Sequence, residues 1–371
     1  MGKTGIPVSA LGFGCMRLPT VQGGTVDEEL AVAMMRTAID NGVNYFDTAY
    51  VYHSGQSEAV LGRALDNGYR DRVSIATKMP TWSVTQASDF DRFFEEQCER
   101  LHTDRIDFYL LHNLSQERWA LLKNLNIARW AEKAKQQGRI GFFGFSFHHS
   151  FDIFKQFIDS YDWDFCQIQY NYMNEDVQAG TRGLQYAAKK DMAVVIMEPL
   201  LGGNLANPPG PVRRIFESSP VKRTPADHAL QWLWNKPEIS LVLSGMSAMD
   251  QVTQNIESAG RSGVGTMTEE NLRIIDLART EYRKLSAISC TKCAYCMPCP
   301  NGVDIPRNLE LYNEGIMYNN FGLSKGLYTT VFPASIRAEQ CTACRSCEEK
   351  CPQHIAISSW LAKIHQTLTG A

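Results

Sequence analysis

The sequence lacks three features that would mark a membrane, nucleic-acid-binding or secreted protein. No run of roughly 18 apolar residues is present, so no segment is expected to cross a membrane as a helix. The net charge is −3, with 37 Lys and Arg against 40 Asp and Glu, which argues against a nucleic-acid or anionic-membrane partner. The first residues lack the charged and apolar regions of a secretory signal. We therefore expect a cytoplasmic protein.

Cysteine is scarce through most of the chain. Of 11 cysteines, only Cys15, Cys98 and Cys166 lie outside two short runs near the C-terminus. Because cytoplasmic thiols stay reduced, clustered cysteines more often hold metal than form disulfides. A chain of 371 residues with 44% hydrophobic residues is long enough for one large and one small domain. We place the predicted domains at residues 1–285 and 286–371.

The first of these domains alternates short β-rich segments with helical ones. The predicted strands span residues 11–16, 44–49, 73–79, 106–112, 140–148, 165–171, 193–199 and 239–245. Segments with amphipathic or helix-forming character follow them. Eight such pairs over roughly 250 residues predict an α/β fold of the (β/α)₈ TIM-barrel type. A doubly wound open sheet is the alternative, but no GxGxxG follows the first strand and the units are too many for it.

Polar residues stand at three successive strand ends. Asp47 ends the second predicted strand, Lys78 ends the third and His112 ends the fourth, while Tyr52 lies in the loop just beyond Asp47. Taken singly, each side chain could be a solvated charge or a packed core residue. Active sites of TIM barrels lie at the C-terminal ends of the strands. The four together therefore indicate one site.

This set of side chains suits the reduction of a carbonyl group. Hydride reduction needs a proton donor for the developing alkoxide and a donor that polarises the oxygen. A tyrosine with its ordinary pKa near 10 is a poor acid at neutral pH unless a neighbouring cation lowers that pKa. We predict Tyr52 as the acid, Lys78 as the cation, Asp47 as the residue that holds Lys78, and His112 as the residue that orients the substrate oxygen.

The segments that carry these residues resemble the aldo/keto reductase family, in the branch with a C-terminal ferredoxin-like iron–sulfur domain. The opening GKTGIPVSALGFGCMRLP, the stretch FDTAYVYHSGQSEAVLGRAL and the strand ends IATKM and LLHN match the family's catalytic motifs. The segments GFFGFSFH, FCQIQYN and GMSAMDQVTQNI resemble its cofactor-binding motifs. The resemblance implies NADP(H) as cofactor, with NAD(H) as the alternative, and a small carbonyl or alcohol substrate.

The resemblance also implies a set of cofactor contacts. They are Gly14, Cys15, Met16, Asp47, Ser146, Gln167, Glu198, Leu200, Gly202, Gly245, Ser247, Gln251 and Asn255. Ser146 and Gln167 would bind the nicotinamide carboxamide, and Glu198 stands where the family often places an aromatic ring. Between Gly245 and Asn255 there is no Lys or Arg for a 2′-phosphate. We expect modest discrimination between NADPH and NADH unless another residue, for instance Arg261, supplies the charge.

The two cysteine runs are CTKCAYCMPCP and CTACRSCEEKCP. The second has the ferredoxin spacing C-x₂-C-x₂-C-x₃-C-P, in which the fourth cysteine serves the other cluster of two-cluster proteins. The first run has one residue fewer before its last cysteine, which makes Cys299 the least regular ligand. Zinc and disulfides are alternatives, but the spacing favours two [4Fe–4S] clusters. The predicted ligands are Cys290, Cys293, Cys296, Cys299, Cys341, Cys344, Cys347 and Cys351.

Helical segments are expected beside these runs. Residues 268–285 are predicted to form the helix that leads out of the barrel. Residues 301–320 have helical periodicity and resemble the helix between the two motifs of α-helical ferredoxins. We therefore expect the clusters to be flanked by helices.

Two functions compete. In the first, the barrel reduces an aldehyde or ketone, and the clusters stabilise the fold or exchange electrons with a redox partner protein. In the alternative, the protein is an electron-transfer oxidoreductase whose barrel performs flavin- or radical-dependent chemistry. Nicotinamide carries two electrons as hydride and a cluster carries one, so direct coupling would need a flavin or an equivalent. No flavin motif is evident, which favours the first. A third interpretation, a nucleotide-binding regulatory subunit, would have no need of the acid Tyr52.

Overall fold

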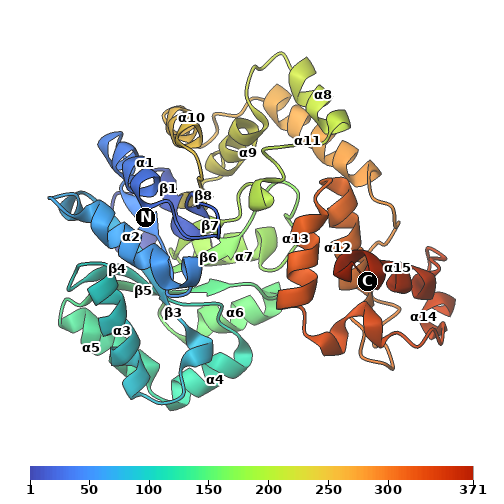
Figure 1. The fold of residues 1–371 in the computed structure, drawn as a ribbon, viewed down its shortest axis with the longest axis horizontal. Helices are drawn as coiled ribbons and strands as arrows, with labels where there is room; N and C mark the ends of the chain where they lie inside the picture. The colour runs from blue at the N-terminus through green and yellow to red at the C-terminus, as the bar shows by residue number, and fades with distance from the viewer. Residues whose placement is uncertain (371) are drawn as a thin grey trace. The chain divides into compact units, whose positions relative to one another are not determined.

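The computed structural model describes residues 1–370, which form two compact units. The first comprises Met1–Gly202 and Ala226–Glu270; the second comprises Gly203–Pro225 and residues 271–370. The chain therefore leaves the first unit after its seventh strand and returns to it before the eighth (Figure 1). The domain boundary at residues 285 and 286 stays a prediction.

The first unit is built around a closed barrel of parallel strands. Each strand pairs with the next along the chain, and the last pairs with the first, so the sheet has no free edge. The strands are β1 (Leu11–Gly14), β2 (Tyr45–Asp47), β3 (Ser74–Met79), β4 (Ile106–Leu111), β5 (Ile140–Phe147), β6 (Phe165–Gln169), β7 (Ala193–Met197) and β8 (Leu241–Gly245). This architecture confirms the predicted (β/α)₈ fold, although several strands are shorter than predicted.

Helices connect the strands of this unit. They are α1 (Glu28–Asp40), α2 (Gln56–Leu65), α3 (Ser88–Arg100), α4 (Gln116–Asn124), α5 (Ile127–Gln136), α6 (Phe151–Ser160), α7 (Gly180–Lys189), α9 (Pro225–Trp234) and α10 (Met249–Ala259). Helix α1 begins at Asp27, whose side chain accepts a hydrogen bond from Leu30 N. Its buried residues Ala31, Met34, Met35 and Ala38 recur at helical spacing, which gives the helix one apolar face.

An apolar layer fills the N-terminal end of the barrel. Its buried members are Tyr45, Ala76, Phe108, Leu110, Phe165, Ala193, Val195, Leu241 and Leu243, and Ile6 and Val8 from the N-terminal segment pack against it. Burial of one large apolar side chain contributes about 1.5–3 kcal/mol. Because this end is closed by hydrocarbon, the polar strand ends gather at the other end.

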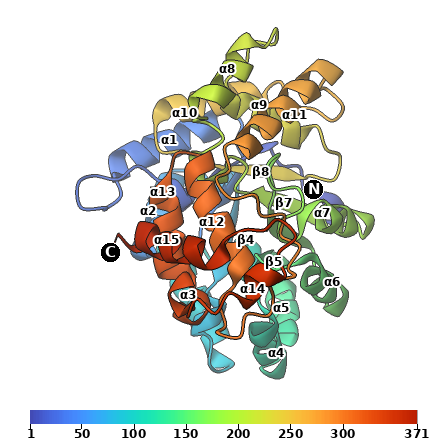
Figure 2. The ribbon, with the colours of Figure 1, turned by 90° about the vertical axis from the view of Figure 1, so that its right-hand side faces the viewer.

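The second unit is helical. Its helices are α8 (Gly210–Ser218), α11 (Glu269–Lys284, from residue 271 on), α12 (Ile305–Met317), α13 (Phe321–Gly326), α14 (Ser346–Glu349) and α15 (Ile357–Thr369). Both helices predicted around the first cysteine run are present as α11 and α12. Helix α12 begins after Asp304, whose side chain accepts a hydrogen bond from Arg307 N. Figure 2 shows α12, α13 and α15 packed together.

The core of the second unit includes Ile305, Leu309, Tyr312, Ile357 and Leu361, all buried. Six of the eight clustered cysteines pack against this core: Cys290, Cys296, Cys299, Cys341, Cys347 and Cys351. The predicted cluster ligands therefore lie at the edge of an apolar interior.

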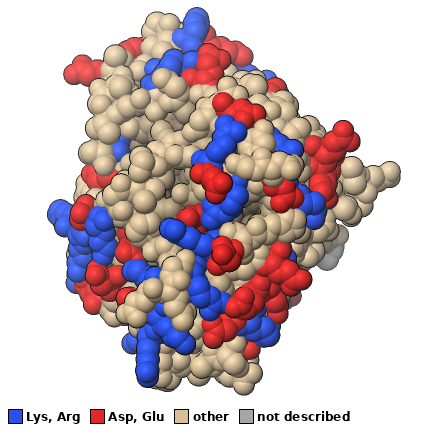
Figure 3. Space-filling model, turned by 90° about the vertical axis from the view of Figure 1, so that its left-hand side faces the viewer, with Lys and Arg blue, Asp and Glu red and all other residues tan. Residues whose placement is uncertain are grey.

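Charges of both signs are interspersed on the face of the molecule in Figure 3. Ion pairs that join neighbouring elements of the first unit include Arg72 with Asp40 at 2.8 Å and Arg139 with Asp91 at 3.1 Å. Among residues 1–370, no helix combines the length and apolar character needed to cross a membrane.

Candidate active site

Three of the four predicted catalytic residues stand on, or directly after, adjacent barrel strands. Asp47 is the last residue of β2 and is paired in register with Ala76 of β3, two residues before Lys78. His112 directly follows β4, and its backbone N donates to Met79 O at 3.0 Å. Tyr52 begins a short 3₁₀ turn after β2 (Tyr52–Gly55). All four residues therefore belong to the C-terminal end of the barrel.

Lys78 is the centre of the site. Its Nζ donates to Asp47 Oδ1 at 2.6 Å, to Thr48 O at 2.7 Å and to Tyr52 OH at 3.2 Å. An ammonium group has three hydrogens, so these acceptors satisfy it. The side chains of Lys78 and Asp47 are only 1% and 4% exposed. A buried ammonium with a complete set of acceptors is held in one place and stays charged.

The pKa values follow from burial and from this ion pair. Burial by itself disfavours the Lys78 ammonium, but Asp47 and Tyr52 together raise the pKa of Lys78 above its ordinary value. Burial raises the pKa of Tyr52, and the charge of Lys78 opposes that rise. Lys78 thus lowers the pKa of Tyr52, as the partner of a general acid should, although the effect of burial is larger here.

His112 faces Tyr52 across the site. The two rings meet edge to face, with centroids 6.0 Å apart, and the Trp82 ring lies 5.0 Å from His112 on another side. Burial, with the charges of Lys78 and His148, holds the pKa of His112 well below its ordinary value. The imidazole is therefore neutral at pH 7. A neutral imidazole carries one N–H that can donate to a carbonyl oxygen.

The turn that carries Tyr52 has an unusual backbone. His53 and Ser54 adopt left-handed conformations with φ of 50° and 55°, followed by Gly55 at 90°. Non-glycine residues rarely adopt this conformation without support. Here His53 Nε2 accepts a hydrogen bond from Leu18 N at 3.1 Å, which ties the turn to the segment after β1. The sequence pattern did not indicate this role for His53.

Ser146 and Gln167, the predicted carboxamide contacts, are neighbours in register on β5 and β6. Both are nearly fully buried. Ser146 Oγ accepts a hydrogen bond from Asn113 N at 2.8 Å. Gln167 Oε1 is buried and has no partner among residues 1–370. A buried acceptor without a donor fits an amide ligand that is not part of the chain.

Gly14 and Gly245 are paired in register at the ends of β1 and β8. A Cβ on Gly14 would lie 3.3 Å from Ser244 O, so the two strand ends approach closely here. Met16, two residues after Gly14, is 59% exposed. Cys15 is fully buried, and burial raises the pKa of its thiol far above the ordinary value, so it is not a nucleophile.

The loop after β7 is also left-handed in part. Glu198, Leu201 and Gly202 have φ of 55°, 48° and 66°. Glu198 is exposed, its carbonyl oxygen accepts from Asn171 Nδ2 at 3.1 Å, and Leu200 beside it is half-buried. The loop therefore carries no aromatic ring at Glu198, the position where the family often has one.

The last predicted cofactor segment follows β8. Gln251 Oε1 accepts from Ser247 N at 2.9 Å, which brings these two residues together at the start of α10. Asn255 lies deeper: it is 7% exposed and donates to Ser244 Oγ at 3.0 Å. The structure thus keeps Ser247 and Gln251 accessible and places Asn255 in the packing of α10 against β8.

Two arginines, Arg17 and Arg261, are candidates for the phosphate groups of a dinucleotide. Arg261 is already engaged by Glu257 at 2.7 Å and Asp227 at 3.1 Å. Arg17 is exposed and makes no ion pair with any residue from 1 to 370. A Cβ placed on Gly245 would meet the side chain of Arg17 at 3.3 Å. The sequence analysis did not single out Arg17, because only the closure of β1 onto β8 places it beside the late segment.

In the second unit, four cysteines from both runs line one pocket: Cys290, Cys293, Cys296 and Cys351. Apolar residues such as Leu309 and Ile355 complete its lining. The last cysteine of the second run therefore lies with the first three of the first run. This is the crossed arrangement expected of a two-cluster ferredoxin.

The two cysteine loops also share a backbone conformation. The residues before and after the second cysteine are left-handed in both: Lys292 and Ala294 at 57° and 61°, Ala343 and Arg345 at 55° and 62°. The two runs thus share a backbone conformation around their second cysteine, whereas only the second run continues into a helix, α14. No three Cys, His, Asp or Glu side chains among residues 1–370 converge on a single-ion site. An apolar pocket with four free thiols fits an iron–sulfur cluster, whose ligands stand further apart than those of one ion.

Comparison with known proteins agrees with both units. Residues 10–276 match the model of the aldo/keto reductase family, and residues 289–356 match a 4Fe-4S dicluster domain. The chain therefore belongs to the aldo/keto reductase family and carries a C-terminal 4Fe-4S dicluster domain.

Individual relatives cover the barrel. L-galactose dehydrogenase of Arabidopsis thaliana is 28% identical over 308 residues, which cover 77% of this chain and 95% of that protein. The solved structure of aldo-keto reductase AKR11C1 from Bacillus halodurans has a TM-score of 0.63 at 25% identity, covering 75% of this chain and 94% of that one. An aldo-keto reductase from Klebsiella pneumoniae in complex with NADPH shares the fold, with a TM-score of 0.59 at 23% identity over 73% of this chain and 90% of that one.

Proposed function

We propose that the protein reduces an aldehyde or ketone to the alcohol, using NAD(P)H and Tyr52 as general acid. The observation that carries this proposal is the convergence of Asp47, Tyr52, Lys78 and His112, with Lys78 Nζ bonded to both Asp47 and Tyr52. The relatives that share the barrel include a dehydrogenase and a reductase in complex with NADPH, which supports the same reaction class.

In this reaction the residues divide the work between them. The neutral His112 donates a hydrogen bond to the carbonyl oxygen and orients it beside Tyr52. The nicotinamide, when bound, supplies the hydride to the carbonyl carbon. Tyr52 transfers its phenolic proton to the oxygen, and Lys78 stabilises the phenolate that remains. Asp47 fixes Lys78 and maintains its charge.

The cofactor would be held by the strand ends described above. Ser146 and Gln167 would hold the carboxamide, with Gln167 Oε1 accepting from its NH₂ group. Arg17 would offer positive charge to the phosphates, which the segment from Gly245 to Asn255 lacks. NADPH is the expected cofactor because a relative binds it, while NADH remains the alternative.

The second unit would hold two [4Fe–4S] clusters. Cys290, Cys293, Cys296 and Cys351 would ligate one, and Cys341, Cys344, Cys347 and Cys299 the other. When bound, such clusters supply one-electron transfer and structural stability. We propose that they serve a redox partner protein or the fold, separately from hydride transfer. Reduced thiols of this kind also agree with a cytoplasmic location.

Substitution of Tyr52 by Phe tests the catalytic proposal. The variant should lose about 10²–10⁴-fold in turnover, the usual worth of acid–base assistance, and keep its nucleotide affinity. Steady-state oxidation of NADPH with a panel of aldehydes measures turnover, and fluorescence titration measures affinity. A loss smaller than about tenfold, or a wild-type protein that oxidises NADPH with no aldehyde in the panel, would contradict the proposal.

One observation favours the alternative function, electron transfer with flavin- or radical-dependent chemistry in the barrel. The match over residues 289–356 is to a dicluster domain, and two clusters can pass electrons one at a time to a partner. The two functions differ in electron count. Reduction of the clusters by a one-electron donor, followed by substrate turnover without NAD(P)H, would favour the alternative.

A further inference from the structure

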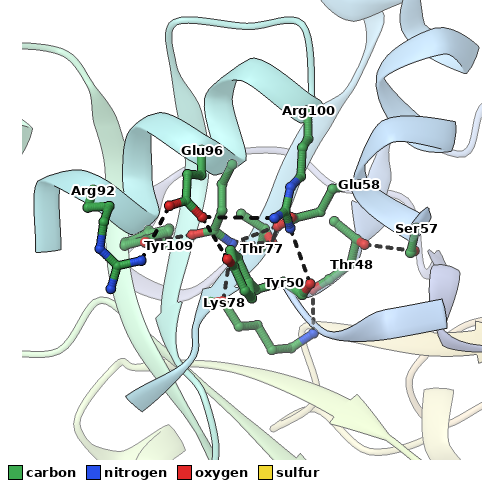
Figure 4. A network of polar contacts seen from close by, with 11 residues as sticks. Thr48, Tyr50, Ser57, Glu58, Thr77, Lys78, Arg92, Glu96, Arg100 and Tyr109 are labelled. Carbon is green, nitrogen blue, oxygen red and sulfur yellow. Dashed lines mark hydrogen bonds and ion pairs between the residues drawn. The ribbon is translucent and has the colours of Figure 1, made fainter. Parts of the chain in front are cut away.

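A buried hydrogen-bond network lies beside Lys78 (Figure 4). Its centre is Glu58 of α2, whose side chain is completely buried. The carboxylate accepts from Thr77 Oγ1 at 2.6 Å, from Gln97 Nε2 at 2.6 Å and from Arg100 Nη1 at 3.1 Å. Burial raises the pKa of Glu58, and the Thr77 and Gln97 hydrogen bonds and the Arg100 charge oppose that rise.

One branch of the network reaches the backbone of Lys78. Thr77 directly precedes Lys78 on β3, and Gln97 Nε2 lies 3.1 Å from Lys78 O. Gln97 is itself held, because its Oε1 accepts from Tyr109 OH at 2.7 Å. Glu58 therefore fixes the strand position from which the ammonium of Lys78 extends.

The other branch reaches the loop of Tyr52. Arg100 Nη1 donates to Tyr50 O at 3.3 Å, and its guanidinium lies 4.2 Å from the centre of the Tyr50 ring. The Tyr50 hydroxyl donates to Glu96 Oε2 at 2.6 Å. Tyr50 is two residues from Tyr52, and α2, the helix of Glu58, follows the Tyr52 turn directly. The segments that carry Tyr52 and Lys78 are thus both connected by hydrogen bonds to the Glu58 carboxylate.

We propose that Glu58 is a positioning residue that sets the separation of Tyr52 OH from Lys78 Nζ, 3.2 Å in this structure. The inference rests on the proposed function. Stability alone does not call for a buried ionic cluster, since well-packed apolar residues often serve as well. A displacement of about 1 Å at a reacting group can lower the rate about 10²-fold. A carboxylate with three donors from two different elements is suited to preventing such a displacement.

Glu58→Gln tests the proposal with little change in volume. The amide cannot accept from every donor at this position, and its NH₂ group would confront one of them. We expect kcat to fall by about 10- to 100-fold, with the nicotinamide dissociation constant and the aldehyde KM within about twofold of wild type. Arg63→Gln is the matched control, because Arg63 lies on the same helix and pairs with Glu28 at the surface.

The pH profile separates positioning from a general loss of structure. The groups that face Tyr52 are Lys78, Asp47, Cys15 and the ring of His112, and of these Lys78 is the one that lowers the pKa of Tyr52. If Lys78 moves away, the pKa of Tyr52 rises. Because the reduction needs protonated Tyr52, the alkaline limb of kcat should move to higher pH in Glu58→Gln.

Arg100→Gln provides a second, independent variant should Glu58→Gln not fold. It cuts the branch to Tyr50 and leaves the branch to Lys78, so the same changes are expected at smaller size. All variants are assayed as full-length, cluster-containing protein with nitrobenzaldehyde and NADPH, beside Tyr52→Phe. Full activity of Tyr52→Phe would overturn the proposed function. Inactive Tyr52→Phe, with wild-type kcat and alkaline limb in the folded Glu58 or Arg100 variant, would overturn only the positioning role. A loss of nucleotide affinity in step with kcat would overturn it as well.

Discussion

The two candidate sites of this protein are organised in different ways. In the barrel, the fold itself supplies every partner of the Lys78 ammonium, within 3.2 Å. In the second unit, the clustered cysteines are free thiols, half-buried or exposed, in loops with left-handed residues. The contacts of the Lys78 ammonium are thus complete before any cofactor arrives. The thiols of the cysteine loops would instead gain their bonds only when metal binds. Metal binding would therefore contribute directly to folding.

Removal of iron should show the difference between the two sites most clearly. Anaerobic treatment with an iron chelator is expected to abolish amide-exchange protection in α12 and α15, whose apolar core borders the cysteines. Strands β2 to β4 should keep their protection, because their bonds do not involve metal. Hydrogen exchange followed by mass spectrometry measures both regions at once. Equal loss of protection in the barrel would show that the two units do not differ in this way.

Single cysteine substitutions sharpen the comparison within the second unit. Wild-type protein should carry about eight irons, and Cys351→Ala should lose about half of them. The lost cluster should be the one assigned to Cys290, Cys293 and Cys296, because Cys351 shares their pocket. Cys299→Ala should damage the other cluster, seen as a different change in the electron paramagnetic resonance spectrum. Cys166→Ala, a buried cysteine of β6, is the control and should keep all its iron.

In the barrel, substitution of Arg17 tests whether this side chain binds a phosphate group of the nucleotide. Arg17→Gln should raise the NADPH dissociation constant by about tenfold, since a hydrogen bond to a charged group is worth about 1.5–3 kcal/mol. A smaller effect on NADH would locate the contact at the 2′-phosphate, and an equal effect at the diphosphate. Arg261→Gln should change little, because Glu257 and Asp227 already occupy its guanidinium. Fluorescence titration measures all four constants, and a stronger effect of Arg261 would reverse the assignment.

Acid should act on the barrel through the half-buried His148. Burial, with a contribution from His149, lowers the pKa of His148 to about 4. Because this value lies below that of the unfolded chain, near 6.5, the unfolded state binds the proton first. The stability contribution is therefore complete above pH 6.5 and is lost as the pH falls toward 4. The melting temperature of wild type should decline more steeply over this range than that of His148→Asn, and identical slopes would contradict the assignment.

The sequence was sufficient for the barrel and for the residues at its strand ends. Periodicity predicted eight strands, and because parallel strands end on one side, Asp47, Lys78 and His112 were expected to meet. The Glu58 network was not predictable, because its partners come from α2, β3 and α3 and meet only through packing. Arg17 was missed for the same reason. The roles of the individual site residues stay predictions until they are measured.

The path of the chain through the second unit was also not predictable. In the sequence, residues 203–225 lie between a strand and a helix of the barrel. Nothing in their composition indicates that they belong to another unit. Their membership in the second unit arises from tertiary bonds. Tyr282 OH donates to Asn204 O at 3.3 Å, and Asn320 Nδ2 donates to Asn204 Oδ1 at 2.9 Å.

This discontinuity limits how the protein can be divided. A stop codon after α11 would delete the cysteine loops but leave Gly203–Pro225 in the shortened chain. The shortened chain would keep α11 and its hydrogen bond from Tyr282 OH to Asn204 O, but it would lose Asn320 and the hydrogen bond to Asn204 Oδ1. A chain shortened in this way would therefore need a new partner for Asn204 Oδ1. The aldo/keto reductase match runs without a break over residues 10–276, so a gene fusion that gained the cysteine loops would need one junction only.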